Sequence, residues 1–174
     1  MQYAQKSMIN LSSVLRLFLL LLLCISFLSA CGFKLRGAYQ LPAAMQTTYI
    51  SSQVSADFLR SLKLALKASK IKLLDEPADD IAVLKLFRES KTKRTVSVDS
   101  KGRAREYTLT YAISFTLNNQ DQAFAIEEQT LSIERDFLFD PEDVLGNSRG
   151  EAQLYDEMQQ DLVRLILLRL QSKA

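Results

Sequence analysis

Histidine is absent from the 174 residues of this chain, and cysteine occurs only twice. Without histidine, Ser-His-Asp and Cys-His catalysis, histidine-ligated zinc and histidine-based pH switching are excluded. Glycine is also scarce, with five residues, and neither a Walker-type phosphate loop nor a G-x-S-x-G nucleophile motif is present. We therefore expect a protein that is not an enzyme and that holds no metal ion and no bound cofactor.

The chain also has no large excess of positive or negative charge. Lysine and arginine total 22 residues against 20 aspartate and glutamate residues, so binding of nucleic acid through bulk positive charge is not expected. Two acidic clusters, at 75–80 and 140–143, each contain proline and lie between periodic segments, which is typical of solvated turns. Hydrolysis by paired carboxylates is the weakest alternative, because nothing beyond these turns supports it.

What the chain does contain is a long apolar run near its start. Leucine predominates between Leu17 and Leu28, and the only charges before this run are Lys6 and Arg16. The run has 12 residues, whereas a transmembrane helix needs about 20. It ends in Leu28-Ser29-Ala30-Cys31-Gly32, with small residues placed as at the cleavage site of an export signal. The cysteine after the cut resembles the bacterial lipobox, which implies a diacylglyceryl group on the Cys31 thiol.

This pattern divides the chain into three parts. We expect a lipoprotein signal peptide at 1–30, an acylated linker at 31–45 and a single domain at 46–174. Removal of 30 of the 174 residues leaves 144, which is an ordinary domain size that can bury a core without disulfides. None is available, because the one remaining cysteine carries lipid. An uncleaved signal anchor and a start at Met8 are the alternatives left open.

Lipid on Cys31 would determine where the protein works. One acyl chain binds a membrane only reversibly, whereas two signals hold a protein there stably. In lipoproteins of bacteria with two membranes, aspartate after the lipidated cysteine favours retention in the inner membrane. Gly32 occupies that position here, so the resemblance to these lipoproteins implies transport to the outer membrane.

Alternation of apolar and polar residues predicts three long strands. The strictest alternation has six apolar residues at every second position, namely Tyr107, Leu109, Tyr111, Ile113, Phe115 and Leu117. Period-two alternation indicates a strand with one face on a core. The run 81–98 is interpreted as one long, bulged strand that leads into a tight turn with Gly102 at positive φ. A third strand is expected at 124–139, where Arg135 breaks the apolar phase without a predicted role.

Two amphipathic helices and a short strand complete the pattern. β-Branched and aromatic residues predict a strand at 47–51. Ser55 is a suitable N-cap for a helix that ends near Ser69. The last helix is expected from Leu154 to about Gln171, behind a glycine-containing loop at 146–150. The order β-α-β-β-β-α predicts an α+β fold of two layers, a four-stranded and largely antiparallel sheet with both helices packed on one face.

Several short motifs connect the mature chain to a known family. Cys31-Gly32-Phe33 is followed by Leu35-Arg36 and then by Pro42. Further along stand Arg105-Glu106-Tyr107, after a turn with glycine, and Arg135-Asp136-Phe137, ahead of Asp140-Pro141. With these motifs the chain resembles the LptE family of LPS-assembly lipoproteins over essentially its whole mature length. The resemblance implies a partner, the LptD β-barrel, in whose lumen the domain sits as a plug while both deliver lipopolysaccharide to the outer leaflet.

The resemblance also implies direct binding of lipopolysaccharide, through basic residues at a hairpin tip and before the last helix. The matching candidates are Lys101, Arg103, Arg105 and Arg149. Ser100 stands where the family has its tip arginine, so Lys101 or Arg103 would substitute for it. The planar guanidinium group of arginine suits the phosphates of lipid A. Weaker candidates on the same hairpin are Lys91, Lys93 and Arg94. A solvated charge cluster is the other interpretation of these residues.

Two classes of function follow. The first is a non-enzymatic assembly factor that works in the LptD barrel at the outer membrane, with its domain in the lumen or on the periplasmic side. The second is a stand-alone, periplasm-facing lipoprotein that binds a small molecule or glycan, which would need a pocket with converging polar groups. The hydroxyl-rich face of the strand at 108–116 suits a polar barrel lumen, and it equally suits an ordinary solvent-facing sheet.

Overall fold

The computed structural model of the protein describes residues 15–16, 18–19, 39–119 and 124–172. The chain divides into two compact units, residues 1–36 and 37–174, and all elements named below belong to the second. Cys31 and the boundary after the expected signal peptide lie outside the described residues, so the three-part division stays a prediction. Within the described part of the chain, no helix is both long and apolar enough to cross a membrane.

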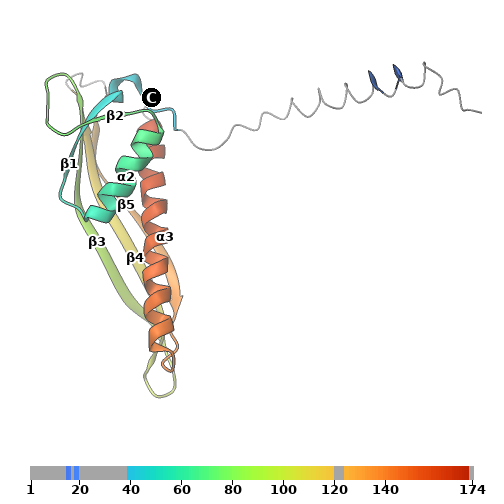
Figure 1. The fold of residues 1–174 in the computed structure, drawn as a ribbon. Helices are drawn as coiled ribbons and strands as arrows, with labels where there is room; N and C mark the ends of the chain where they lie inside the picture. The colour runs from blue at the N-terminus through green and yellow to red at the C-terminus, as the bar shows by residue number, and fades with distance from the viewer. Residues whose placement is uncertain (1–14, 17, 20–38, 120–123, 173–174) are drawn as a thin grey trace, which may run out of the picture. The chain divides into compact units, whose positions relative to one another are not determined.

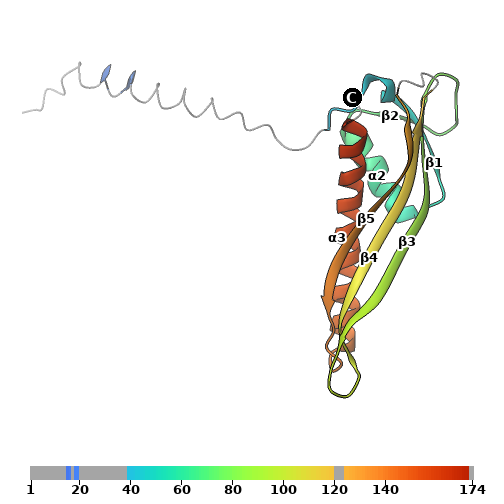
Figure 2. The ribbon, with the colours of Figure 1, turned by 180° about the vertical axis from the view of Figure 1, so that it is seen from behind.

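Three long strands and two helices make up most of the second unit (Figures 1 and 2). In chain order the elements are the 3-10 helix η1 (Ala43–Met45), β1 (Thr47–Ser52), α2 (Ala56–Ala68), β2 (Lys72–Leu74), β3 (Ala82–Val98), β4 (Ala104–Asn118), β5 (Ile126–Leu138) and α3 (Val144–Gln171). One sheet contains all five strands, in the order β2-β1-β3-β4-β5. β1 runs parallel to β2 and β3, whereas β3, β4 and β5 are antiparallel neighbours.

The predicted α+β class is confirmed, with both helices on the same face of the sheet (Figure 1). The predicted number of strands was wrong, because β2 adds a fifth strand that runs parallel to β1. β2 has only three residues, too few for a periodic signal in the sequence. Its position is held by pairing with its neighbour, since the backbone N–H of Lys72 donates to the carbonyl of Gln46 at 2.8 Å.

The core lies between the sheet and the two helices. Along β4 the predicted alternation is confirmed, since every second residue from Leu109 to Leu117 is fully buried. The helices cover this face with buried side chains that include Phe58, Leu62 and Leu66 of α2 and Met158, Leu162 and Ile166 of α3. Full burial of one such side chain contributes about 1.5–3 kcal/mol. Hydrophobic packing between the layers is therefore the main stabilising contribution.

The predicted bulge in β3 is confirmed at a definite place. The pairing with β4 changes register between Phe87 and Ser90, and Arg88 has a φ of 52°. A bulge changes the direction of the side chains beside it. As a result, the side chain of Glu89 reaches the start of α2. Its carboxylate accepts hydrogen bonds from the backbone N–H of Ser55 at 2.5 Å, from the Ser55 hydroxyl at 2.9 Å and from the hydroxyl of Tyr111. The bulge thus connects the sheet to the N-terminus of α2.

Helix α3 begins ten residues earlier than expected, at Val144 rather than Leu154. Asp143 is the N-cap, and its Oδ1 accepts a hydrogen bond from the backbone N–H of Gly146 at 2.9 Å. The glycines that predicted a loop lie within the helix instead. A Cβ at Gly146 would collide with the Asp143 carboxylate, and one at Gly150 would lie 3.4 Å from the ring of Phe137. Close approach accounts for Gly146, whereas a Cβ at Gly150 would make only an ordinary van der Waals contact.

Candidate functional site

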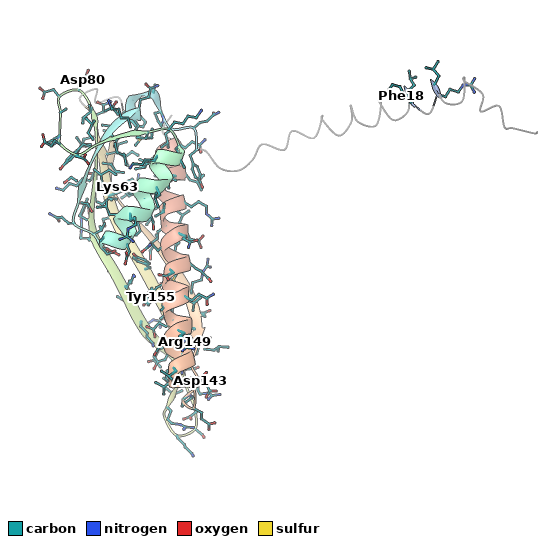
Figure 3. The ribbon with its side chains drawn as sticks, in the orientation of Figure 1. Phe18, Lys63, Asp80, Asp143, Arg149 and Tyr155 are labelled. Atoms are coloured by element: carbon teal, nitrogen blue, oxygen red, sulfur yellow. The ribbon has the colours of Figure 1, made fainter. Side chains whose placement is uncertain are left out.

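The four predicted binding residues lie at one end of the domain, although the chain separates them by up to 48 positions. Lys101 and Arg103 are in the β3–β4 turn, and Arg105 is near the start of β4. Arg149, which is labelled in Figure 3, is in the second turn of α3. The backbone N–H of Phe139, on the way to α3, donates to the carbonyl of Arg105 at 2.9 Å. We call this end, formed by residues 96–105 and 138–149, the tip. Their role in binding stays a prediction.

Arg103 is occupied inside the turn. Its Nε lies 2.8 Å from Oδ2 of Asp99, and Oδ1 of the same carboxylate accepts hydrogen bonds from the backbone N–H groups of Lys101 and Arg103 at 2.8 and 2.9 Å. The backbone N–H of Arg103, and then its guanidinium and the backbone of Lys101, lower the pKa of Asp99. Gly102, with a φ of 75°, closes the turn as predicted. Arg103 therefore stabilises the turn, whereas the exposed Lys101 forms no ion pair with any residue that the structure describes.

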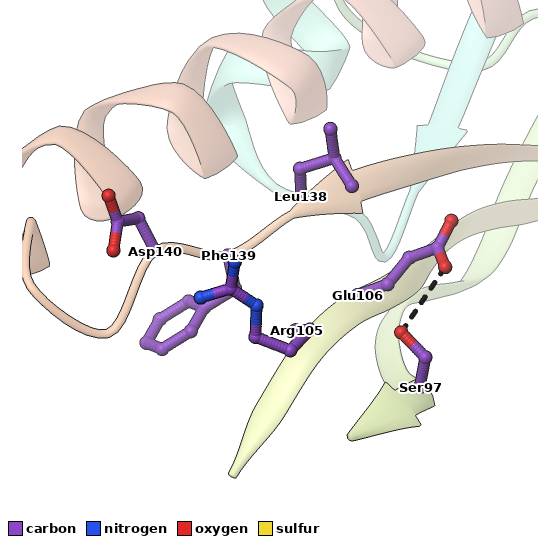
Figure 4. A pocket seen from close by; sticks show the side chains of 6 residues that line it. All are labelled: Ser97, Arg105, Glu106, Leu138, Phe139 and Asp140. Atoms are coloured by element: carbon purple, nitrogen blue, oxygen red, sulfur yellow. Dashed lines mark hydrogen bonds between the residues drawn. The ribbon is translucent and has the colours of Figure 1, made fainter. Parts of the chain in front are cut away.

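Arg105 borders a small cavity beside the turn. The cavity has a volume of about 260 Å³ and is lined by Ser97, Arg105, Glu106, Leu138, Phe139 and Asp140 (Figure 4). The Glu106 carboxylate accepts a long hydrogen bond of 3.4 Å from the Ser97 hydroxyl. Two carboxylates against one guanidinium make the cavity itself unsuitable for a phosphate. The exposed guanidinium of Arg105 on its rim remains suited to one.

Lys93 and Lys91, the weaker candidates on β3, are turned toward aromatic rings. The Nζ of Lys93 lies 4.2 Å from the ring centre of Tyr107 and 2.5 Å from Oε2 of Glu151 on α3. Lys91 Nζ lies 4.7 Å from the ring centre of Tyr111. A cation over an aromatic face is attracted to the ring by its quadrupole. Lys91 Nζ also lies 5.3 Å from the ring centre of Tyr155 on α3, so both lysines connect the first half of α3 to the sheet.

Exposed apolar side chains share the tip with the cations, and the sequence analysis did not identify them. Five large ones occur there, namely Val96, Val98, Leu138, Val144 and Leu145. Leu138 is 78% exposed and Leu145 is 73% exposed. Clustered exposed apolar residues mark sites of contact with membranes, lipids or proteins. The sequence did contain one indication of this surface. Leu138 directly follows the inward-facing Phe137 in a strand, so its side chain must face the opposite side of the sheet.

Three cations of the tip are exposed and form no ion pair with any described residue: Lys101, Arg105 and Arg149. Four carboxylates balance the formal charge of the four tip cations: Asp99 binds Arg103, Asp143 caps α3, and Asp140 and the exposed Glu142 lie between β5 and α3. The tip thus offers three cations that form no ion pair within the described residues, beside exposed aliphatic side chains. That combination suits an amphiphile that carries both phosphate and hydrocarbon.

The sheet face away from the helices is polar. Hydroxyl groups run along its middle on β4, and their partners are on β5: Thr108 donates to Asp136 at 3.3 Å, and the Ser114 and Thr130 hydroxyls lie 2.8 Å apart. Ser114 is only 2% exposed, because neighbouring side chains cover it. No group of acidic or cysteine side chains that could hold a metal ion occurs among the described residues.

Comparison with known proteins places this arrangement among lipoproteins. A family model described as "LptE: Lipopolysaccharide-assembly" matches residues 40–170. The LPS-assembly lipoprotein LptE of Photorhabdus laumondii is 30% identical over 155 residues, which cover 88% of this chain and 84% of that protein. The LPS-assembly lipoprotein LptE of Pectobacterium atrosepticum is 31% identical over 161 residues, which cover 87% and 85%.

Solved structures agree with the fold. The crystal structure of rare lipoprotein B from Shewanella oneidensis is similar with a TM-score of 0.65 and 26% identity, over 72% of this chain and 94% of that chain. The solution structure of a lipoprotein B from Nitrosomonas europaea gives a TM-score of 0.62 and 27% identity, over 78% and 88%. Because the family model spans the whole two-layer domain except for its last two described residues and Tyr39, the chain belongs to the LptE lipopolysaccharide-assembly family.

Proposed function

We propose that this protein is a membrane-associated lipoprotein that helps to assemble lipopolysaccharide into the outer leaflet of the outer membrane, in complex with an LptD β-barrel. Membership of the LptE family supports the role in lipopolysaccharide assembly. The observation that carries the binding function is the tip, where Lys101, Arg105 and Arg149 stand beside exposed leucine and valine side chains.

The chemistry of lipopolysaccharide fits this surface. Lipid A carries phosphates on its sugars and several acyl chains beside them. Arginine binds phosphate through two parallel N–H donors, and lysine binds it as a point charge. Leu138 and Leu145 offer apolar surface within the same end of the domain. Contact of this kind would separate single molecules from aggregated lipopolysaccharide.

The proposed place inside a barrel is supported by the polar outer surfaces of the domain. The lumen of a wide outer-membrane barrel is polar and filled with water. The open sheet face offers hydroxyls on β4 and acidic side chains on β5, such as Glu134 and Asp136. A plug with such a face can form hydrogen bonds to the lumen wall and displace its water.

The binding function is tested by charge reversal at two sites of the tip. We expect Lys101→Glu combined with Arg149→Glu to weaken binding of purified lipopolysaccharide by about 10- to 100-fold, since each lost charge-assisted contact costs about 1.5–3 kcal/mol and partial compensation is usual. Direct titration of the folded variant with lipopolysaccharide measures this. Arg60→Glu with Lys63→Glu, on α2, is the matched control of equal charge change and should bind normally. Unchanged affinity in the tip variant would remove the binding role.

The barrel partnership is tested separately. We expect affinity purification of the tagged protein from detergent-solubilised outer membranes to recover a large β-barrel protein in equal amount. Mass spectrometry of the mature N-terminus in the same sample should find acylated Cys31 as the first residue. Recovery of the protein alone would instead favour the stand-alone, periplasm-facing ligand-binding lipoprotein.

A further inference from the structure

A second recess lies at the end of the domain away from the tip. It has a volume of about 610 Å³, and it is bordered by the first described residues, by the start of β1 and by the connection from α2 to β2. Its lining includes Tyr39, Leu41, Gln46, Ser69, Lys70 and Lys72. We call this recess the basal cleft. Neither the plug role nor the binding of lipopolysaccharide at the tip uses it.

Two lysines are fixed at the cleft by the backbone. Lys70 follows the last turn of α2 in the left-handed conformation, with a φ of 65°, and its N–H donates to the carbonyl of Lys67 at 2.9 Å. Lys72 opens β2 and is held by its hydrogen bond to Gln46. Both side chains are exposed, while Ile71 between them is buried and anchors the connection. Neither lysine forms an ion pair with a described residue.

The acidic residues that follow β2 do not neutralise this pair within the cleft. None of residues 75–80 is among those that line it, and Figure 3 shows Asp80 on the outer loop beyond β2. The rest of the lining is uncharged, with hydroxyl and amide groups on one part and Tyr39 and Leu41 on another. The cleft therefore combines two cations, neutral donors and an apolar wall.

The chain itself keeps the cleft close to lipid. Tyr39 stands eight residues after Cys31, and eight fully extended residues span at most about 29 Å. In the proposed lipoprotein the cleft therefore stays within that distance of the leaflet that holds the acylated cysteine. The phosphates of lipid headgroups are anions that lie within such a distance.

We propose that the basal cleft binds the phosphate-bearing headgroup of an anionic glycerophospholipid from the leaflet that holds the lipid anchor. The ammonium groups of Lys70 and Lys72 contact the phosphate as point charges. The side-chain amide of Gln46 donates hydrogen bonds to the headgroup, and Tyr39 and Leu41 cover the start of its acyl chains. The inference rests on the lipid anchor of the proposed function, and it depends neither on the barrel nor on lipopolysaccharide.

The test uses the mature acylated protein in nanodiscs. One set contains phosphatidylcholine alone, and the other contains about one-third phosphatidylglycerol. We expect amide hydrogen exchange of residues 69–72 to be at least about fivefold slower in the anionic discs, because a bound headgroup closes the cleft to water. The variant Lys70→Gln with Lys72→Gln should lose this difference, whereas Lys101→Gln with Arg149→Gln at the tip should keep it.

Three outcomes would overturn the inference. Equal exchange in the two kinds of disc, or protection that persists in the Lys70→Gln, Lys72→Gln variant, would exclude a headgroup site. The same protection from inorganic phosphate in neutral discs would show a site for free phosphate instead of lipid. Lipopolysaccharide titration of the Lys70→Gln, Lys72→Gln variant keeps the two proposals apart, because that variant should bind lipopolysaccharide normally even if the cleft binds nothing.

Discussion

Replacing Phe58 by alanine should lower the free energy of unfolding by about 3–5 kcal/mol, which is the usual cost of removing a fully buried phenylalanine side chain. Phe58 is the first buried residue of α2, and its exposed fraction is 0%. Its ring packs edge-on against Tyr111 of β4, with 6.1 Å between the ring centres. The substitution opens a cavity between the two layers at the point where α2 begins. Urea denaturation, followed by circular dichroism, measures the loss.

Leu64 of the same helix provides the matched control. Its side chain is 63% exposed, so Leu64→Ala should change the free energy of unfolding by no more than about 0.5 kcal/mol. A similar loss in both variants would contradict the difference in burial between the two positions, because alanine is the better helix former at both. A small loss for Phe58→Ala alone would contradict the assigned packing of α2 on β4.

Glu89→Ala is expected to have the second largest effect, with a loss of about 2–3 kcal/mol. The carboxylate accepts three hydrogen bonds, two from Ser55 and one from Tyr111. Its removal takes one partner from the N-terminus of α2 and leaves the fully buried Tyr111 without an acceptor for its hydroxyl, and each such loss costs about 1–2 kcal/mol. Urea denaturation at pH 7 measures this, and Glu127→Ala, at an exposed position of β5, is the control.

The same carboxylate makes stability depend on pH. Burial by itself would raise the pKa of Glu89, but the hydrogen bonds from Ser55 and Tyr111, with the positive charge of Lys91, lower it below the ordinary value of 4.5. A carboxyl group whose pKa is lowered on folding contributes stability above its unfolded pKa, and that contribution is lost as the pH falls through the folded pKa. Stability should therefore fall below about pH 4.5.

Glu89→Gln separates this group from the other carboxylates. The amide keeps one acceptor oxygen but does not titrate, so the variant should be less stable at pH 7 and should lose part of the decrease at acid pH. Tyr111 makes the stability depend on pH at the alkaline end as well. Burial and the Glu89 charge raise the pKa of Tyr111, so stability should also decline as the pH rises past about 10, where the unfolded tyrosine ionises. If the stability of Glu89→Gln falls at acid pH by as much as that of the unchanged protein, residues other than Glu89 cause the fall.

Features carried by local periodicity were predictable from the sequence. Strict alternation from Tyr107 to Leu117 identified the inward face of β4, and Ser55 identified the start of α2, because both depend on neighbours within a few positions. The bulge in β3 was predictable in kind, since an apolar run passed into a polar one without a turn. Its consequence, the contact of Glu89 with Ser55, joins residues 34 positions apart and leaves no local signal.

Features that depend on distant partners were missed. Arg135 breaks the apolar phase of β5 because its guanidinium reaches Asp161 of α3 at 2.9 Å. The N-terminal part of α3 was taken for a loop, since Gly146 and Gly150 lower helix propensity, but the Asp143 cap and contact with Phe137 outweigh it. β2 depends wholly on the strand beside it.

The candidate site also has features that could be predicted from the sequence and features that could not. Resemblance to the LptE family supplied Lys101, Arg103, Arg105 and Arg149, and the fold gathers them at one end. Only the structure separates Arg103, which is engaged by Asp99, from the three unpaired cations. The exposed Leu138 and Leu145 were not predictable as partners of those cations, because the strand and the helix that carry them meet only in the folded domain.

Helix α3 also sets a length. Its 28 residues run without a break, which at 1.5 Å per residue amounts to about 42 Å, and it extends from the tip to the end of the domain near the basal cleft (Figure 1). A bilayer with its headgroups is about 40–45 Å thick. If the domain stands in a barrel as proposed, with α3 along the barrel axis, its two ends lie about one bilayer thickness apart. The length of the folded domain is then enough to place the basal cleft near one leaflet and the tip near the other.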